Sequence, residues 1–179
     1  RFCLVLLVAT LLAWVVVPEA PATGWSFVVT SVFHAVRLVR WRGWSTLAEP
    51  LVAVLHVGYL WLVAAFMLIG LAIVWPGSFT TTASLHSLSA GAVGTMTLAV
   101  MTRASLGHSG RPLTAGPATL AIYVLVSLGA ILRVLAPELP FDYVGLLTLA
   151  AVLWSGAFTL FVLCYGPLLA GGRKRAPAA

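Results

Sequence analysis

Charge is scarce in this sequence, and negative charge is almost absent. Only 8% of the 179 residues are charged, with 10 Lys and Arg against 4 Asp and Glu, whereas 61% are hydrophobic. A water-soluble domain of this length cannot bury so much apolar surface, so the composition excludes that class. Several apolar runs reach about the 20 residues that cross a hydrocarbon core. The expected fold class is therefore all-α, a polytopic helical membrane protein.

Cysteine is also scarce, and the motifs of several enzyme classes are missing. The sequence has no P-loop, no HExxH and no Ser-His-Asp context, which disfavours nucleotide hydrolysis, zinc proteolysis and serine hydrolysis. The apolar runs carry no acidic residue at their middle, where a proton-coupled transporter commonly keeps a carboxylate. Cys3 and Cys164 are the two cysteines. They are expected as small apolar side chains, with a soft copper-ligand pair as the alternative.

Six apolar runs follow one another along a single membrane domain, residues 1–179. Prolines, glycines and charged residues separate them, as is typical of the turns between helices. The first run is short for a span at ~1.5 Å per residue, and a signal peptide is its alternative interpretation. Because five further runs follow, a first transmembrane helix is favoured. We expect spans at about residues 2–17, 25–40, 50–75, 83–102, 116–136 and 143–169.

The basic residues fall on one side of the membrane if these spans alternate in direction. Of the ten Lys and Arg residues, only Arg133 falls on the other side, with Glu19, Glu138 and Asp142. The positive-inside rule then places both termini in the cytoplasm. The orientation of the spans thus explains the excess of basic over acidic residues, and nucleic acid is not expected as a partner. The residues on the cytoplasmic side are Arg1, Arg37, Arg40, Arg42, Arg103, Arg111, Arg173, Lys174 and Arg175.

Two histidines are expected at one depth in the bilayer. His34 lies six residues before Arg40, and His56 lies seven residues after Glu49. At ~1.5 Å per residue both imidazoles lie about 9–10 Å from the cytoplasmic interface. On adjacent antiparallel helices the two rings can hold one metal or haem iron between them, or serve as hydrogen-bonded packing residues.

A third histidine, His86, lies near the outer end of the fourth run. Arg103 follows seventeen residues later, ~25 Å away along a helix, so His86 cannot share a metal with His34 or His56. Its partner must come from the outer half of another helix or from chain outside this sequence. A histidine in lipid is a candidate functional residue by default.

Small residues accompany His86 along its helix. Ala90, Gly94 and Thr97 lie in nearly the same direction as His86 at ~100° per residue, and Ser87 and Gly91 form an adjacent pair of small residues. Such a groove admits either a neighbouring helix or a flat macrocycle, and the sequence does not choose between them.

Three polar residues mark the inner end of the same segment. Arg103 and Arg111 are candidates to bind haem propionates or lipid phosphates through bidentate contacts, with ordinary positive-inside anchoring as the alternative. His108 lies between them and is expected at the membrane surface.

The segments His86–Pro112 (HSLSAGAVGTMTLAVMTRASLGHSGRP) and Arg37–Trp61 (RLVRWRGWSTLAEPLVAVLHVGYLW) resemble the NnrS family. These are polytopic bacterial membrane proteins linked to the nitric oxide response. The sequence departs from the family pattern mainly at Ser87, Ser89 and Ser109. The resemblance covers nearly the whole chain. It implies haem and copper as cofactors, a bacterial inner-membrane location, and protection against nitrosative stress.

The family is about twice as long as this chain, with about twelve spans, so the chain is expected to be its C-terminal half. The N-terminal half is then a partner, and its histidines are natural partners for His86. The positions that match family histidines are His34, His56, His86 and His108.

The resemblance makes the first functional hypothesis a haem- and copper-binding protein that handles nitric oxide or its iron adducts. His86 is the first candidate metal ligand, and His34 with His56 is the second. The expected cofactor-binding set adds His108, Arg103 and Arg111. Two alternatives stay open: a metal-free membrane transporter or scaffold, and a bis-histidine electron-transfer cytochrome.

Overall fold

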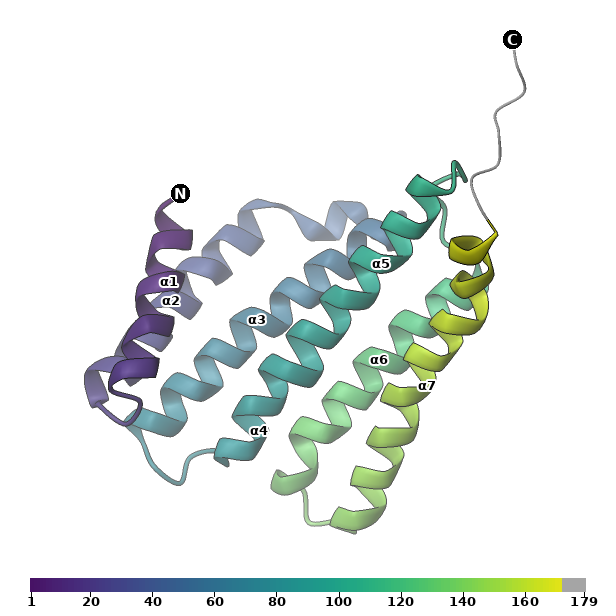
Figure 1. The fold of residues 1–179 in the computed structure, drawn as a ribbon. Coiled ribbons are helices and arrows are strands. Elements are labelled where there is room, and N and C mark those ends of the chain that lie inside the picture. The colour runs from purple at the N-terminus through teal and green to yellow at the C-terminus, as the bar shows by residue number, and fades with distance from the viewer. Residues whose placement is uncertain (172–179) are drawn as a thin grey trace.

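The computed structural model describes residues 1–171 as a bundle of antiparallel helices (Figure 1). Residues 1–171 contain no β-strand, so the all-α prediction is confirmed. The helices are α1 (Phe2–Val16), α2 (Pro21–Arg40), α3 (Pro50–Val74), α4 (Thr81–His86), α5 (Gly94–His108), α6 (Pro117–Leu135) and α7 (Tyr143–Ala170). Shorter elements are the 3-10 turns η1 (Gly43–Thr46) and η3 (Ala136–Glu138) and the π-helical η2 (Ser87–Val93).

Helix starts follow local sequence signals. Pro21, Pro50 and Pro117 occupy the first turns of α2, α3 and α6, where the missing N–H of proline costs no hydrogen bond. The Thr80 hydroxyl and the Asp142 carboxylate accept backbone N–H groups of the first turns of α4 and α7, as capping residues do.

The fourth expected span, residues 83–102, is longer in the structure. Helical residues run without a break from Thr81 through η2 to His108. Arg103 does not end the helix. The helix ends at His108 with Ser109 as its C-cap. Gly110 follows with a φ of +69°, and the Arg111 N–H donates to the Leu106 carbonyl at 3.0 Å, as in a glycine-based C-cap.

Within residues 1–171, four helices are long and apolar enough to cross a membrane: Pro21–Arg40, Pro50–Val74, Pro117–Glu138 and Tyr143–Ala170. The chain is therefore a helical membrane protein. The 15-residue α1 is shorter, and the segment Thr81–His108 changes helix type at η2. Six spans and cytoplasmic termini remain predictions, and Arg173, Lys174 and Arg175, which support that orientation, lie outside the described residues.

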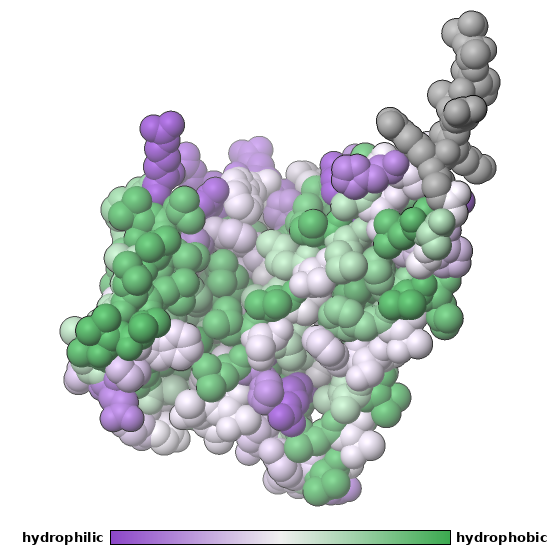
Figure 2. Space-filling view, viewed as in Figure 1, coloured by the Kyte–Doolittle hydropathy of each residue, from purple (hydrophilic) through white to green (hydrophobic). Residues whose placement is uncertain are grey.

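Apolar side chains cover much of the flank of the bundle, and polar side chains gather mainly toward its two ends (Figure 2). Inside, α2 packs on α3 and α6 packs on α7, with η2 and α5 between these two pairs. One core cluster includes Leu98, Ile122, Val126 and Phe161. This packing fixes one face of η2 and α5 against α6 and α7, where the site lies.

A candidate binding site at His86

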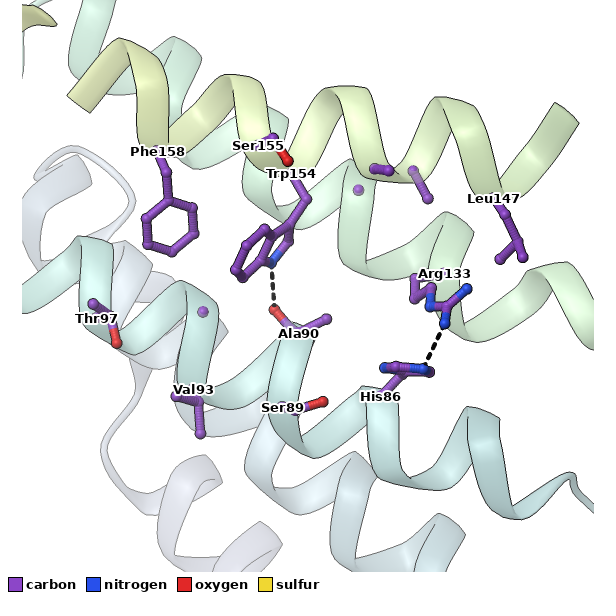
Figure 3. A pocket seen from close by; sticks show the side chains of 14 residues that line it. His86, Ser89, Ala90, Val93, Thr97, Arg133, Leu147, Trp154, Ser155 and Phe158 are labelled. Carbon is purple, nitrogen blue, oxygen red and sulfur yellow. Dashed lines mark hydrogen bonds between the residues drawn. The ribbon is translucent and has the colours of Figure 1, made fainter. Parts of the chain in front are cut away.

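A cavity of about 560 Å³ lies between the α4–η2–α5 segment, α6 and α7 (Figure 3). This volume falls within the range of about 300–1,000 Å³ that is typical of small-molecule and cofactor sites. His86, Ala90, Gly94 and Thr97 all line it, so the predicted small-residue face is confirmed. The other lining residues are Ser89, Val93, Gly129, Arg133, Leu147, Ala150, Ala151, Trp154, Ser155 and Phe158.

His86 has a partner on another helix. The Arg133 Nη2 atom on α6 donates to the His86 Nε2 atom at 2.8 Å. A guanidinium has only donors, so Nε2 accepts and the ring is a neutral imidazole with its proton on Nδ1. Arg133 cannot act as a metal ligand, so the expected second ligand beside His86, from another helix or from chain outside this sequence, stays a prediction.

Sequence reasoning did not include Arg133 among the site residues. A signal for it was present, because Arg133 is the one basic residue that the alternation of spans places on the outer side, away from the other nine. The positive-inside rule accounts for the other nine basic residues but gives no reason for an arginine at this position. An arginine in or beside a span is therefore a candidate functional residue.

Trp154 on α7 forms the middle of the cavity wall. Its indole Nε1 donates to the Ala90 carbonyl at 3.2 Å, and Ala90 lies in the π-helical η2. A Cβ atom at Gly94 would lie 2.8 Å from Nε1, and one at Gly129 would lie 2.8 Å from the Trp154 backbone nitrogen. Gly94 therefore makes room for the indole, and Gly129 makes room for the α7 backbone that carries it. Single π turns in α-helices occur frequently at functional sites.

The variant Trp154→Phe should lose the indole donor and keep an aromatic ring in the wall. We expect the free energy of unfolding to fall by about 0.5–1.5 kcal/mol, the net value of one hydrogen bond. Denaturant titration in detergent, followed by circular dichroism, measures the change. Trp44→Phe is the control, because Trp44 is exposed and should shift stability by less than about 0.5 kcal/mol. Equal losses in both variants would contradict this role for Trp154.

His34 is buried and both of its ring nitrogens are hydrogen-bonded. Nδ1 lies 2.6 Å from the Tyr59 hydroxyl and Nε2 lies 3.2 Å from the Cys3 carbonyl. The carbonyl can only accept, so Nε2 carries the proton and Nδ1 accepts from Tyr59. Neither nitrogen is free for a metal in this arrangement, which links α2 to both α1 and α3.

His56 has different partners from His34. Its Nδ1 donates to the Val52 carbonyl at 3.1 Å, and its ring packs edge-on against Trp41 at 6.3 Å between centroids. His34 instead stacks on Tyr59 at 5.6 Å, about one turn beyond His56 on α3. The two histidines thus have different contacts, and their expected common depth stays a prediction.

The remaining candidates lie at the other end of α5 from His86. Arg103 and His108 line a second cavity of about 370 Å³, and both side chains are exposed. Arg111 is exposed in the turn after α5. Cys3 and Cys164 are half-buried free thiols on α1 and α7. Within residues 1–171 no group of three or more His, Cys, Asp or Glu side chains is positioned to hold a metal ion.

The fold and the site define an α-helical membrane protein in which a neutral histidine, His86, lines a cofactor-sized cavity. A model of the family described as NnrS protein matches residues 1–173. The chain therefore belongs to the NnrS family, as the sequence motifs indicated. No curated protein and no solved structure matches the chain.

Proposed function

We propose that the chain is the haem-binding part of a bacterial inner-membrane protein that protects against nitrosative stress. The observation that carries the proposal is the neutral His86 imidazole, which lines the 560 Å³ cavity and whose Nε2 accepts a hydrogen bond from Arg133. Family membership supports a role in the nitric oxide response. Neutral imidazole nitrogen is the usual protein ligand of haem iron.

The residues that line the cavity fit a haem. His86 offers a nitrogen ligand, Trp154 and Phe158 offer aromatic walls, and Arg133 offers a cation for a carboxylate. Haem would supply an iron centre able to bind a diatomic ligand such as nitric oxide. The His86 nitrogen would fix the position of the haem in the cavity, and the apolar side chains from α6 and α7 would exclude water from it.

Copper does not fit the described residues. A copper site needs several nitrogen, sulfur or oxygen donors in one place, and residues 1–171 bring no such group of three together. The arrangement around His34, whose two nitrogens are engaged, likewise does not favour a bis-histidine cytochrome. We assign no step to copper.

The variant His86→Ala tests the proposal. We expect wild-type protein purified in detergent to show a Soret band that shifts with nitric oxide, and we expect His86→Ala to lose most of that band. His108→Ala, at the other end of α5, should retain it. A Soret band unchanged in His86→Ala would contradict the assignment of the ligand.

A metal-free scaffold or transporter is the second candidate, and the Arg133–His86 hydrogen bond is what favours it. Interhelical hydrogen bonds of this kind hold membrane helices together without any cofactor. Wild-type protein without a haem spectrum, and without iron or copper in elemental analysis, would favour this function over the first.

A further inference from the structure

Arg133 is a cation inside the bundle without an anion beside it. The described residues that line the cavity include no Asp or Glu, and the guanidinium contact in the cavity is the uncharged His86 ring. Arg133 is half-buried, and its side chain points toward His86 from α6 (Figure 3). A guanidinium has five donors, so most of its hydrogen-bonding capacity is left for a ligand.

The same hydrogen bond occupies the atom that a metal would need. The guanidinium caps the Nε2 lone pair of His86 at 2.8 Å, and two groups cannot use one lone pair. Anything that binds through Nε2 must first draw Arg133 away. An acidic group does this best, because bidentate guanidinium–carboxylate contacts are stronger than a contact to a neutral nitrogen.

We propose that Arg133 is the carboxylate-binding residue of the cavity, and that it exchanges its contact with His86 for a propionate of the bound tetrapyrrole. This inference rests on the proposed haem function. The apolar body of the ligand would extend from Arg133 toward Trp154 and Phe158, the aromatic part of the wall. Binding of the acidic group and release of the imidazole are then one event.

The exchange predicts that one variant has opposite effects on two ligands. Haemin should bind Arg133→Gln up to about tenfold more weakly than it binds wild type. The lost charged hydrogen bond is worth about tenfold to a hundredfold, and removal of the capping contact offsets about tenfold of that loss. Haemin dimethyl ester has no carboxylate and cannot draw Arg133 away. It should bind Arg133→Gln more tightly than wild type, by about tenfold if the capping contact is removed.

Titration of both ligands into the detergent-purified protein of residues 1–179, followed at the Soret band, measures these affinities. Metal-free protoporphyrin IX, followed by fluorescence, should depend on Arg133 and not on His86. Arg40→Gln is the control, because Arg40 is exposed at the end of α2, and unfolding curves check that each variant is folded.

Parallel losses for haemin and its ester in Arg133→Gln would overturn the exchange, since they would show general damage to the cavity. Unchanged haemin affinity in Arg133→Gln, with loss in His86→Ala, would overturn the inference and leave the haem function standing. A wild-type chain that binds palmitate through Arg133 but no haemin would show a fatty-acid site, which contradicts both. A weaker haemin affinity in Arg103→Gln alone would place the propionate contact at the other end of α5.

Discussion

The variant Gly129→Ala is expected to lower the free energy of unfolding by about 1–3 kcal/mol, the usual cost of overpacking a tight contact. The added Cβ would lie 2.8 Å from the Trp154 backbone nitrogen and 3.0 Å from the Ala150 carbonyl oxygen. Both atoms belong to the α7 backbone, which no side-chain rotation can move. Helices α6 and α7 must therefore separate, and Trp154 must leave its position in the cavity wall.

Gly156→Ala is the matched control for this change. Gly156 lies in the same helix pair, and a Cβ atom there meets no other atom within 4 Å. Alanine is the better helix former, so this variant should gain about 0.5–1 kcal/mol. Denaturant titration in detergent compares the free energies of unfolding of the two variants. The tryptophan emission of Gly129→Ala should also shift, because Trp154 leaves its position in the cavity wall. A change in the free energy of unfolding of Gly129→Ala equal to that of Gly156→Ala would show that the close approach of α6 and α7 is not strained by a methyl group.

Replacing His34 with leucine should destabilise the bundle by about 1–2 kcal/mol. The variant leaves the Tyr59 hydroxyl without its 2.6 Å acceptor and removes the contact from α2 to the Cys3 carbonyl of α1. Leucine is similar in size, so the loss reports hydrogen bonding more than volume. His108→Leu, at an exposed position, should change stability by less than about 0.5 kcal/mol.

A double-mutant cycle with Tyr59→Phe separates packing from the hydrogen bond. If the pair acts through the bond, the double variant should lose less than the sum of the two single variants. The cycle also tests the alternative role of His34 as a metal ligand. If His34 is a metal ligand, His34→Leu would contain less bound metal per protein than wild type, and Tyr59→Phe would not. If His34 is a packing residue, both variants keep the metal content of wild type.

The helices were predictable because their signals are local. Apolar runs of membrane length, Pro50 and Pro117 in first turns, and glycines in the connections all lie within a few residues of the feature they determine. The small-residue face beside His86 was predictable for the same reason, since helical periodicity fixes which side chains share a direction.

The contacts between helices were not predictable in this way. A depth count from Arg40 and Glu49 could not show that the hydrogen-bond partner of His34 on α3 is Tyr59. The pairing of His86 with Arg133, 47 residues away, depends on how α6 packs against η2. Such packing follows from the fit of many side chains, which a single sequence does not display.

The π-helical turn from Ser87 to Val93 joins α4 and α5 into one continuous helix. It sets the directions in which the side chains of α4 point relative to those of α5. A wider turn takes in an extra residue, and each residue of an α-helix advances the direction of the side chains by about 100°. Through this one insertion, α4 presents His86 to α6 while α5 still presents Leu98 to the core. Residues on both sides of this irregular turn, His86 before it and Gly94 and Thr97 after it, therefore line one cavity, while Leu98 enters the packed interior.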